Sequence, residues 1–360
     1  MHTTHVIPYI GQAMGGPVYA LAEYAAALVK TDCEVTVASL PQPTDGETVE
    51  FSAKAQLVRQ QHAVGGMFRY HPGFAGKLFR CRAEVIHSHG LWTYASIVAA
   101  RAAEKHNAPH IVAPCGMLQP GALRRSALKK RVCHFAFQKR ILRNAACLHA
   151  KSDAERESLR AYGLINPVAV VPNPVPIPCH LAEIRSDRFR EKNNLSDANV
   201  LFFLGRIHPV KGLRRLLRAW ARMAERAPAW TLVLAGPDEG GHTAELKALA
   251  AELGCLETIR FPGPLQGEEK WRGLCSADLF VLPSDFENFG SAAVEAMGVG
   301  LPVITTTGTP WRDVADNGAG WHVVPTVDAL ADALAQGMAM SDDERRRMGR
   351  NGKEIAQRYT

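Results

Sequence analysis

Residues 278–297 read Asp-Leu-Phe-Val-Leu-Pro-Ser-Asp-Phe-Glu-Asn-Phe-Gly-Ser-Ala-Ala-Val-Glu-Ala-Met. The apolar run that ends at Pro283 is typical of a buried strand, and the Ala-rich stretch after Gly290 is typical of a helix. This order predicts Glu287 in the loop at the carboxyl end of the strand, where α/β sheets bind ligands, and Glu295 inside the helix. Free backbone N–H groups around Gly290 suit phosphate or sugar oxygens. On spacing alone, however, solvated charges explain both glutamates more simply, with Glu287 favoured by the helix dipole.

The same alternation of short β-branched runs and Ala- and Leu-rich stretches extends along the whole chain and predicts parallel α/β sheets. A Pro-rich stretch at residues 171–178 interrupts it, and we interpret this stretch as a hinge between two doubly wound domains, residues 1–178 and 179–360. We expect a helix at Pro17–Lys30. The expected strands lie at residues 5–10, 34–39, 85–88, 110–113, 146–150 and 168–171, and at 200–204, 231–235, 258–261, 279–283, 302–305 and 320–324.

The composition is that of a folded protein with uneven charge. Of the 360 residues, 47% are hydrophobic and 21% charged, which excludes disordered, collagen-like and coiled-coil classes. The net charge of +7 divides into +9 for residues 1–180 and −2 for the rest, so we expect the first half to meet an anionic partner. No export signal and no apolar run of spanning length is found, and the eight cysteines form no C-x-x-C pair, as expected of a cytoplasmic protein.

A second motif follows the first expected strand of the second domain. Residues 204–212 read Leu-Gly-Arg-Ile-His-Pro-Val-Lys-Gly and place Arg206 and Lys211 beside a turn bounded by glycines. A bidentate guanidinium and a compact ammonium together suit a diphosphate. Taken alone, such a loop is more often a polar connection.

Together these motifs resemble the donor half of the family 4 glycosyltransferases (glycosyl transferases group 1), retaining enzymes of GT-B fold in which two Rossmann-like domains face each other across a cleft. The seven-residue gap between Glu287 and Glu295 is the most diagnostic mark. The likeness runs in order through residues 204–212, 235–238, 261–265, 284–297 and 300–304, and more loosely through residues 15–17, 85–92, 113–117 and 171–173 of the first half.

The resemblance implies roles for individual residues. Arg206 and Lys211 would neutralise the donor diphosphate, and Glu295 would bind the nucleotide ribose. Glu287, with the backbone of Asn288, Phe289 and Gly290, would bind the donor sugar. Pro264 and Leu265 would pass near the base, and Gly16 would let the first domain approach the diphosphate. His89 would lie near the reacting carbon, although a buried, hydrogen-bonded histidine is its structural alternative, as we expect for His87.

The chemistry of the family needs little from a general base. Positive charge develops on the sugar ring and negative charge on the leaving diphosphate, so Arg206 and Lys211 would act by electrostatic stabilisation. The leaving phosphate takes the acceptor proton on the same face, and the product keeps its configuration. The sequence contains no D-x-D after an apolar strand and no His/Cys cluster with ligand spacing, so we expect neither a metal nor another cofactor.

Residues 105–152 contain no Asp or Glu and ten Lys or Arg. The segment 124–143 is expected to form one amphipathic helix with Leu128, Val132, Phe135, Ile141 and Leu142 on its apolar side. We expect it to contact an anionic membrane or a lipid-linked acceptor; the alternative is a solvated helix whose apolar side packs on the sheet. Nucleic acid is not expected, because stacking platforms are lacking. The candidate cations are Arg124, Arg125, Lys129, Lys130, Arg131, Lys139 and Arg140.

The sequence thus predicts a retaining hexosyltransferase that moves a sugar from a UDP-, GDP- or ADP-sugar to a glycan or lipid-linked acceptor in cell-surface polysaccharide or glycolipid biosynthesis. It would be cytoplasmic and peripheral on the inner face of the plasma membrane. Two other functions are considered: a degenerate, non-catalytic protein of the same fold that binds nucleotide or polysaccharide, and a nucleotide-sugar epimerase.

Overall fold

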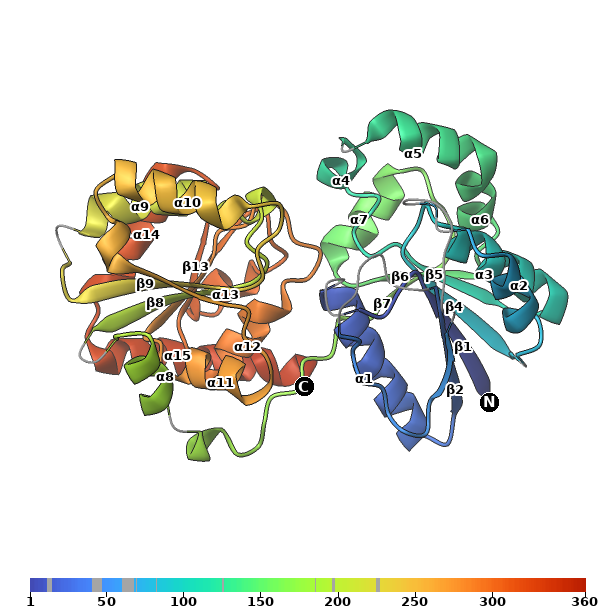
Figure 1. Cartoon of the computed structure of the whole chain (residues 1–360), viewed down its shortest axis with the longest axis horizontal. Coiled ribbons are helices and arrows are strands. Elements are labelled where there is room, and N and C mark those ends of the chain that lie inside the picture. The colour runs from blue at the N-terminus through green and yellow to red at the C-terminus, as the bar shows by residue number, and fades with distance from the viewer. Residues whose placement is uncertain are drawn as a thin grey trace. The chain divides into compact units, whose positions relative to one another are not determined.

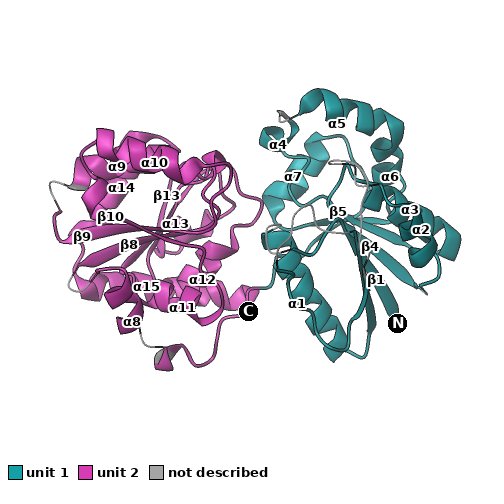
Figure 2. Cartoon of the chain, viewed as in Figure 1, with its two compact units in different colours: residues 1–174 teal, residues 175–360 magenta. Residues whose placement is uncertain are grey.

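The computed structural model describes residues 1–11, 15–40, 47–59, 68, 70–81, 83–124, 126–184, 186–195, 198–224 and 227–360. The chain divides into two compact units, Met1–Pro174 and Val175–Thr360 (Figure 2). This division falls within the Pro-rich stretch and close to the predicted boundary after Pro178. Each unit contains a parallel sheet covered by helices, so the predicted α/β class of two doubly wound domains is confirmed.

The sheet of the first unit has seven strands in the order β3-β2-β1-β4-β5-β6-β7. Its strand β3 (Gln56–Arg59) is absent from the sequence prediction, because a four-residue edge strand with two apolar residues has too little pattern to recognise. The other strands are β1 (His2–Ile7), β2 (Glu34–Ser39), β4 (Val85–His89), β5 (His110–Ala113), β6 (Cys147–Ala150) and β7 (Val168–Val170).

Alternate residues of the central strands meet helices on opposite faces of this sheet. Ile7 of β1 packs in a cluster with Val35 and Val37 and with residues of α1, whereas the preceding Val6 packs with residues of α2 and α3. His5 therefore shares the α1 face. The helices of this unit are α1 (Gly16–Lys30), α2 (Pro72–Leu78), α3 (Tyr94–His106), α4 (Pro120–Arg124), α5 (Ala127–Cys133), η2 (His134–Gln138), α6 (Lys139–Arg143) and α7 (Asp153–Ala161).

The segment 124–143 is not the single helix that its composition predicts. Ser126 has a left-handed backbone (φ 53°) and separates α4 from α5, and the π-helix η2 separates α5 from α6. A π-turn holds more residues than an α-turn and rotates the faces that follow it. Of the five residues assigned to its apolar side, Ile141 and Leu142 are buried, whereas Leu128, Val132 and Phe135 are exposed. Arg125 and the side chain of Arg124 lie outside the described residues.

The second unit has a six-stranded sheet in the order β10-β9-β8-β11-β12-β13. Helices α9, α10 and α14 cover one face, and α8, α11, α12 and α15 cover the other (Figure 1). The strands are β8 (Asn199–Leu204), β9 (Trp230–Ala235), β10 (Ile259–Gly263), β11 (Leu279–Leu282), β12 (Val303–Thr306) and β13 (Gly320–Val323).

The helical elements of the second unit begin with η3 (Leu181–Glu183), α8 (Asp187–Lys192), η4 (Pro209–Lys211), α9 (Leu213–Ala224), α10 (His242–Glu252) and η5 (Leu256–Thr258). They continue with α11 (Gly267–Cys275), α12 (Ser291–Val299), α13 (Asp313–Asp316), α14 (Val327–Ala339), α15 (Asp342–Ala356) and η6 (Gln357–Tyr359). In the described part of the chain, no helix has both the length and the hydropathy that crossing a bilayer requires.

Close packing fixes the carboxyl end of α12, the helix that carries Glu295. Gly349 of α15 lies so near this end that a Cβ atom at position 349 would fall 1.8 Å from the backbone oxygen of Gly300. No side chain can occupy that space without moving one of the two helices. The position of Glu295 along the helix axis thus depends on a glycine in a different helix.

We expect Gly349→Ala to lower the free energy of unfolding by about 1–3 kcal/mol, although alanine favours helices, because the added methyl group overlaps backbone. Thermal unfolding of the variant measures the change. Gly76→Ala in α2 is the control, since its Cβ would have no neighbour nearer than Arg80 Nη1 at 3.9 Å. A Gly349→Ala protein as stable as the wild type would contradict this account of the α12–α15 contact.

Candidate functional site

The order of strands in the second sheet places two sequence motifs next to each other. Strand β8 pairs with β9 on one side and with β11 on the other, which makes the β8–β11 boundary the point where the strand order reverses. Loops at the carboxyl ends of two such strands diverge and leave room for a ligand. The two loops are residues 205–212 and 283–290, and the Asp285 N–H donates to the Val210 carbonyl at 2.8 Å.

Lys211 and Glu287 form an ion pair across these loops. Both side chains are only 13% exposed, so the pair lies in a partly dehydrated environment in which charges interact strongly. Ser284 Oγ donates to Glu287 Oε1 at 3.0 Å, and the Glu287 N–H donates to the Gly308 carbonyl at 2.8 Å. The carboxylate is thus held by an ammonium and a hydroxyl, and its backbone is held by the loop after β12.

Arg206 lies in the same loop as Lys211 but is paired with a different carboxylate. Its guanidinium contacts Glu239, which follows β9, and the Arg206 side chain is 43% exposed. A guanidinium this exposed can exchange its partner at little cost in free energy, whereas the less exposed Lys211 ammonium would be destabilised more by losing its carboxylate. The structure therefore places the two predicted phosphate ligands in one loop, with a separate counterion for each.

Glu295 lies on α12 and pairs with a residue that the sequence analysis missed. Lys270 Nζ of α11 lies 2.6 Å from Glu295 Oε1, and Glu295 is 13% exposed. The sequence around Lys270 contains no motif that would single it out, because the contact depends on how α11 packs beside α12. The carboxylate at this position is therefore ionically anchored before any ligand arrives.

The remaining predicted donor residues surround the start of α12 and the end of β10. Gly290 has a left-handed backbone (φ 78°) and caps α12, while Phe289 is buried against Trp311 and Tyr359 at ring distances of 5.2 and 5.5 Å. Asn288 is half-buried in the same loop. At the edge strand β10, Pro264 is exposed and Leu265 half-buried.

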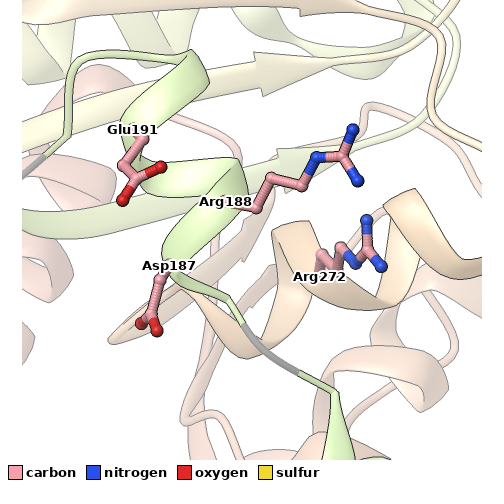
Figure 3. Close-up of a pocket in the computed structure, with 4 residues that line it drawn as sticks. All are labelled: Asp187, Arg188, Glu191 and Arg272. Atoms are coloured by element: carbon pink, nitrogen blue, oxygen red, sulfur yellow. The ribbon is translucent and has the colours of Figure 1, made fainter.

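A hollow of about 480 Å³ lies elsewhere in the second unit, against α8 and α11. It is lined by Asp187, Arg188, Glu191 and Arg272, and the side chains of Arg188 and Arg272 extend toward the same side of it (Figure 3). Arg272 is already paired with Glu268 and Glu269. None of the predicted donor residues lines this hollow, so it is not the candidate site.

The first unit has a strand-order reversal of its own, between β1 and β4. His89 is the last residue of β4, and Gly16 begins α1 after the loop that follows β1. Gly16 is exposed, and a Cβ atom placed there would meet no described atom within 4 Å other than those of its chain neighbours and its own helix. The packing of the described residues therefore does not require a glycine at this position.

His89 belongs to a buried network that the sequence does not reveal. His5 Nδ1 lies 3.1 Å from His89 Nε2, and His149 Nδ1 lies 3.1 Å from His87 Nε2. His5, His87 and His89 come from adjacent strands β1 and β4, and His149 comes from β6, across the small Ala113 of β5. His87 thus has the hydrogen-bonded place predicted for it, and His89 has one too.

Lys151, which follows β6, closes the network. Its Nζ lies 3.0 Å from His149 Nε2 and 3.2 Å from the Tyr24 hydroxyl, and the residue is 3% exposed. Burial lowers the pKa of Lys151 to about 8. Burial, with the charge of Lys151 adding to it, lowers the pKa values of His5 and His149 to about 4, and burial lowers those of His87 and His89 well below the usual range. The histidines are therefore neutral at neutral pH.

Within the described residues, His5, His87 and His89 form the group whose ring nitrogens lie close enough, within 4.8 Å, to hold a metal ion. His5 Nδ1 already bonds to His89 Nε2, and His87 Nε2 to His149 Nδ1, whereas His5 Nε2 is buried and has no hydrogen-bond partner among the described residues. The Lys151 ammonium, which bonds to His149, disfavours a cation nearby, so two hydrogen-bonded pairs of neutral imidazoles describe the cluster better than a metal centre does.

Comparisons with known proteins agree with this geometry. Residues 15–174 match the family model "Glycosyl transferase 4-like domain", and residues 185–355 match "Glycosyl transferases group 1". A D-inositol 3-phosphate glycosyltransferase of Actinosynnema mirum is 29% identical over 324 residues, which cover 82% of this chain and 76% of that protein.

Two solved structures are similar over almost the whole chain. HepE of Anabaena, solved with UDP and glucose, has a TM-score of 0.77 at 18% identity and covers 100% of this chain and 95% of its own. WaaG, a glycosyltransferase involved in lipopolysaccharide biosynthesis, has a TM-score of 0.76 at 17% identity, with 99% and 95% covered. Fold and family models together define an enzyme class, the glycosyltransferases of GT-B fold. The chain belongs to the glycosyl transferases group 1, family 4, as its motifs predict.

The lowered pKa values of His5 and His149 make the first unit sensitive to acid. Between their ordinary pKa of 6.5 and the folded value of about 4, the unfolded state binds more protons. The free energy of unfolding of this unit should therefore fall as the pH falls through that window, by about 1.4 kcal/mol per pH unit for each histidine.

Hydrogen exchange at neutral and mildly acidic pH measures this effect, expressed as opening free energies for amides of β1 and β4. Amides of β8 and β9, strands without histidine, are the internal control. An equal change in both units would contradict the prediction.

Proposed function

We propose that the chain transfers a sugar, with retention of configuration, from a nucleotide-sugar to a glycan or lipid-linked acceptor in cell-surface polysaccharide or glycolipid assembly. The observation that carries the proposal is the Lys211–Glu287 pair at the strand-order reversal of the second sheet. An ammonium held beside a carboxylate at this point offers one charge to phosphate and the other to sugar hydroxyls. The exposed Arg206 guanidinium in the same loop supplies the second cation.

Lys211 and Arg206 would act on the leaving diphosphate. As the bond between the anomeric carbon and the phosphate oxygen breaks, its electron pair goes to the phosphate, whose negative charge then grows. The cations stabilise that charge in the transition state more than in the ground state. The acceptor hydroxyl forms the new bond on the same face and passes its proton to the leaving phosphate, so that no side chain is needed as a base.

The other candidate residues would orient the donor. Glu295, anchored by Lys270, would accept hydrogen bonds from the ribose hydroxyls, and the base would lie near Pro264 and Leu265. The sugar hydroxyls would meet Glu287 and the backbone of residues 288–290. From the first unit, Gly16 would leave room for the diphosphate, and neutral His89 would lie near the reacting carbon.

The donor proposed first is a UDP-sugar, and the acceptor an anionic or lipid-linked molecule. HepE of Anabaena has been solved in complex with UDP-glucose, which supports uracil over the other bases. The acceptor is supported by the net charge of +9 on residues 1–180 and by the relative named for D-inositol 3-phosphate. We place the reaction in the cytoplasm, where nucleotide-sugars are made.

Lys211→Ala and Arg206→Ala should each lower turnover by about two to three orders of magnitude, because each removes one charge that stabilises the leaving group. Steady-state rates of sugar transfer measure the loss. Arg222→Ala is the matched control: Arg222 is an exposed arginine on α9, paired with Asp328, and its loss should leave the rate near that of the wild type. Normal turnover in both Lys211→Ala and Arg206→Ala would remove the diphosphate role.

A thermal-shift screen against UDP-, GDP- and ADP-sugars tests donor binding itself. A ligand at 100 times its dissociation constant adds about 2.7 kcal/mol to the stability of the folded state, so the correct nucleotide should raise the melting temperature clearly. Glu295→Ala should reduce that rise, because the ribose loses its carboxylate partner. A protein stabilised by none of the nucleotide-sugars would argue against the proposed function.

A further inference from the structure

Three large apolar side chains of the first unit lie exposed within eight residues of one another. Leu128, Val132 and Phe135, here termed the apolar ridge, are 74%, 62% and 71% exposed. None of the seven residues of α5, all of them in the described part of the chain, is buried. The short helix therefore contributes nothing to the core, and its apolar residues do not stabilise the unit by packing.

The spacing of the apolar ridge puts its members on one face. Leu128 and Val132 are four residues apart on α5, and Phe135 follows three residues later in η2. After the π-helix η2, the apolar residues are buried instead of exposed. Ile141 and Leu142 of α6 pack in the core and attach the segment to the unit. The exposed apolar ridge thus belongs to a segment that is anchored in the core at its carboxyl end, and its helix α5 lies on the outside of the unit (Figure 1).

Cations surround the apolar ridge. Lys129, Arg131 and Arg140 are exposed, and Lys139 Nζ lies 5.9 Å from the centre of the Phe135 ring. Lys130 bonds to the Ala122 carbonyl, and Arg140 pairs with Glu104, just outside the acid-free residues 105–152. The positive charges of residues 105–152 cannot be neutralised from within this segment, since it contains no carboxylate side chain. The surface therefore combines exposed apolar groups with an excess of positive charge.

We propose that this surface docks the chain on an anionic lipid bilayer, with the apolar ridge inserted between headgroups and the cations of residues 129–140 against lipid phosphates. A bilayer offers acyl chains and negative charge at adjacent depths, and an amphipathic basic helix satisfies both at once. Nucleic acid also offers negative charge, but it has no apolar region that could take up the side chains of the apolar ridge, so we favour the bilayer. This inference is independent of the proposed donor chemistry, because it uses none of the donor residues.

The test is flotation of the full chain with vesicles of phosphatidylcholine alone and with vesicles that also contain phosphatidylglycerol. The wild type should float with the anionic vesicles at low ionic strength, and binding should weaken as salt screens the cations. The variant Leu128→Ser, Val132→Ser, Phe135→Ser should lose about tenfold or more of its vesicle affinity, because the inserted surface is gone. Lys129→Gln with Arg131→Gln should lose affinity for anionic vesicles.

Val324→Ser is the control, since Val324 is an exposed aliphatic residue (54%) of the second unit and its loss should leave flotation unchanged. Each variant should also keep the thermal shift that the nucleotide-sugar produces in the wild type, so a failure of docking is separable from a failure of the proposed function. Equal flotation of the apolar-ridge variant and the wild type, or capture of the wild type by another protein without any vesicle binding, would overturn the proposal.

Discussion

The largely buried ion pair between Lys211 and Glu287 connects the two loops on which the proposed donor chemistry of the second unit depends. Two charges that are 13% exposed stabilise each other strongly, because the loss of Lys211 would leave the Glu287 carboxylate with only the Ser284 hydroxyl beside it. The pair therefore holds the loops after β8 and β11 against each other. In the proposed reaction, it would also keep an ammonium where negative charge develops on the phosphate. Glu295 and Lys270 repeat the arrangement on α11 and α12.

The fold could be predicted in large part because parallel strands are buried on both faces and form continuous apolar runs. Strands β2 and β5 begin and end where the sequence predicts, and the other predicted strands differ by a few residues at their ends. Strand β3 escaped detection because an edge strand needs little apolar sequence. The prediction of one continuous helix over residues 124–143 was wrong. Neither the left-handed backbone of Ser126 nor the π-helix η2 can be recognised from the amino-acid composition of the segment.

The candidate site could be predicted only where its residues lie in one motif. Arg206, Lys211, Glu287 and Glu295 stand in loops or helices with recognisable spacing. Lys270, His5, His149 and Lys151 do not, because their contacts arise from strand order and helix packing between residues far apart in the chain. The alternation His87-Ser-His89 indicates two histidines on one face of a strand, yet their partners appear only when β1 and β6 are placed.

The open space beside Gly16 separates two constraints that often act on one residue together, namely packing within the fold and contact with a ligand. At glycines such as Gly236, Gly320 and Gly349, a Cβ atom would overlap backbone atoms of the protein itself, so a variant that fails there reports on folding. At position 16 the described residues leave the space for a side chain open. If Gly16 lies beside the diphosphate as we propose, the residues that a folded, working enzyme tolerates at position 16 would therefore report on the size and shape of the bound substrate rather than on the fold.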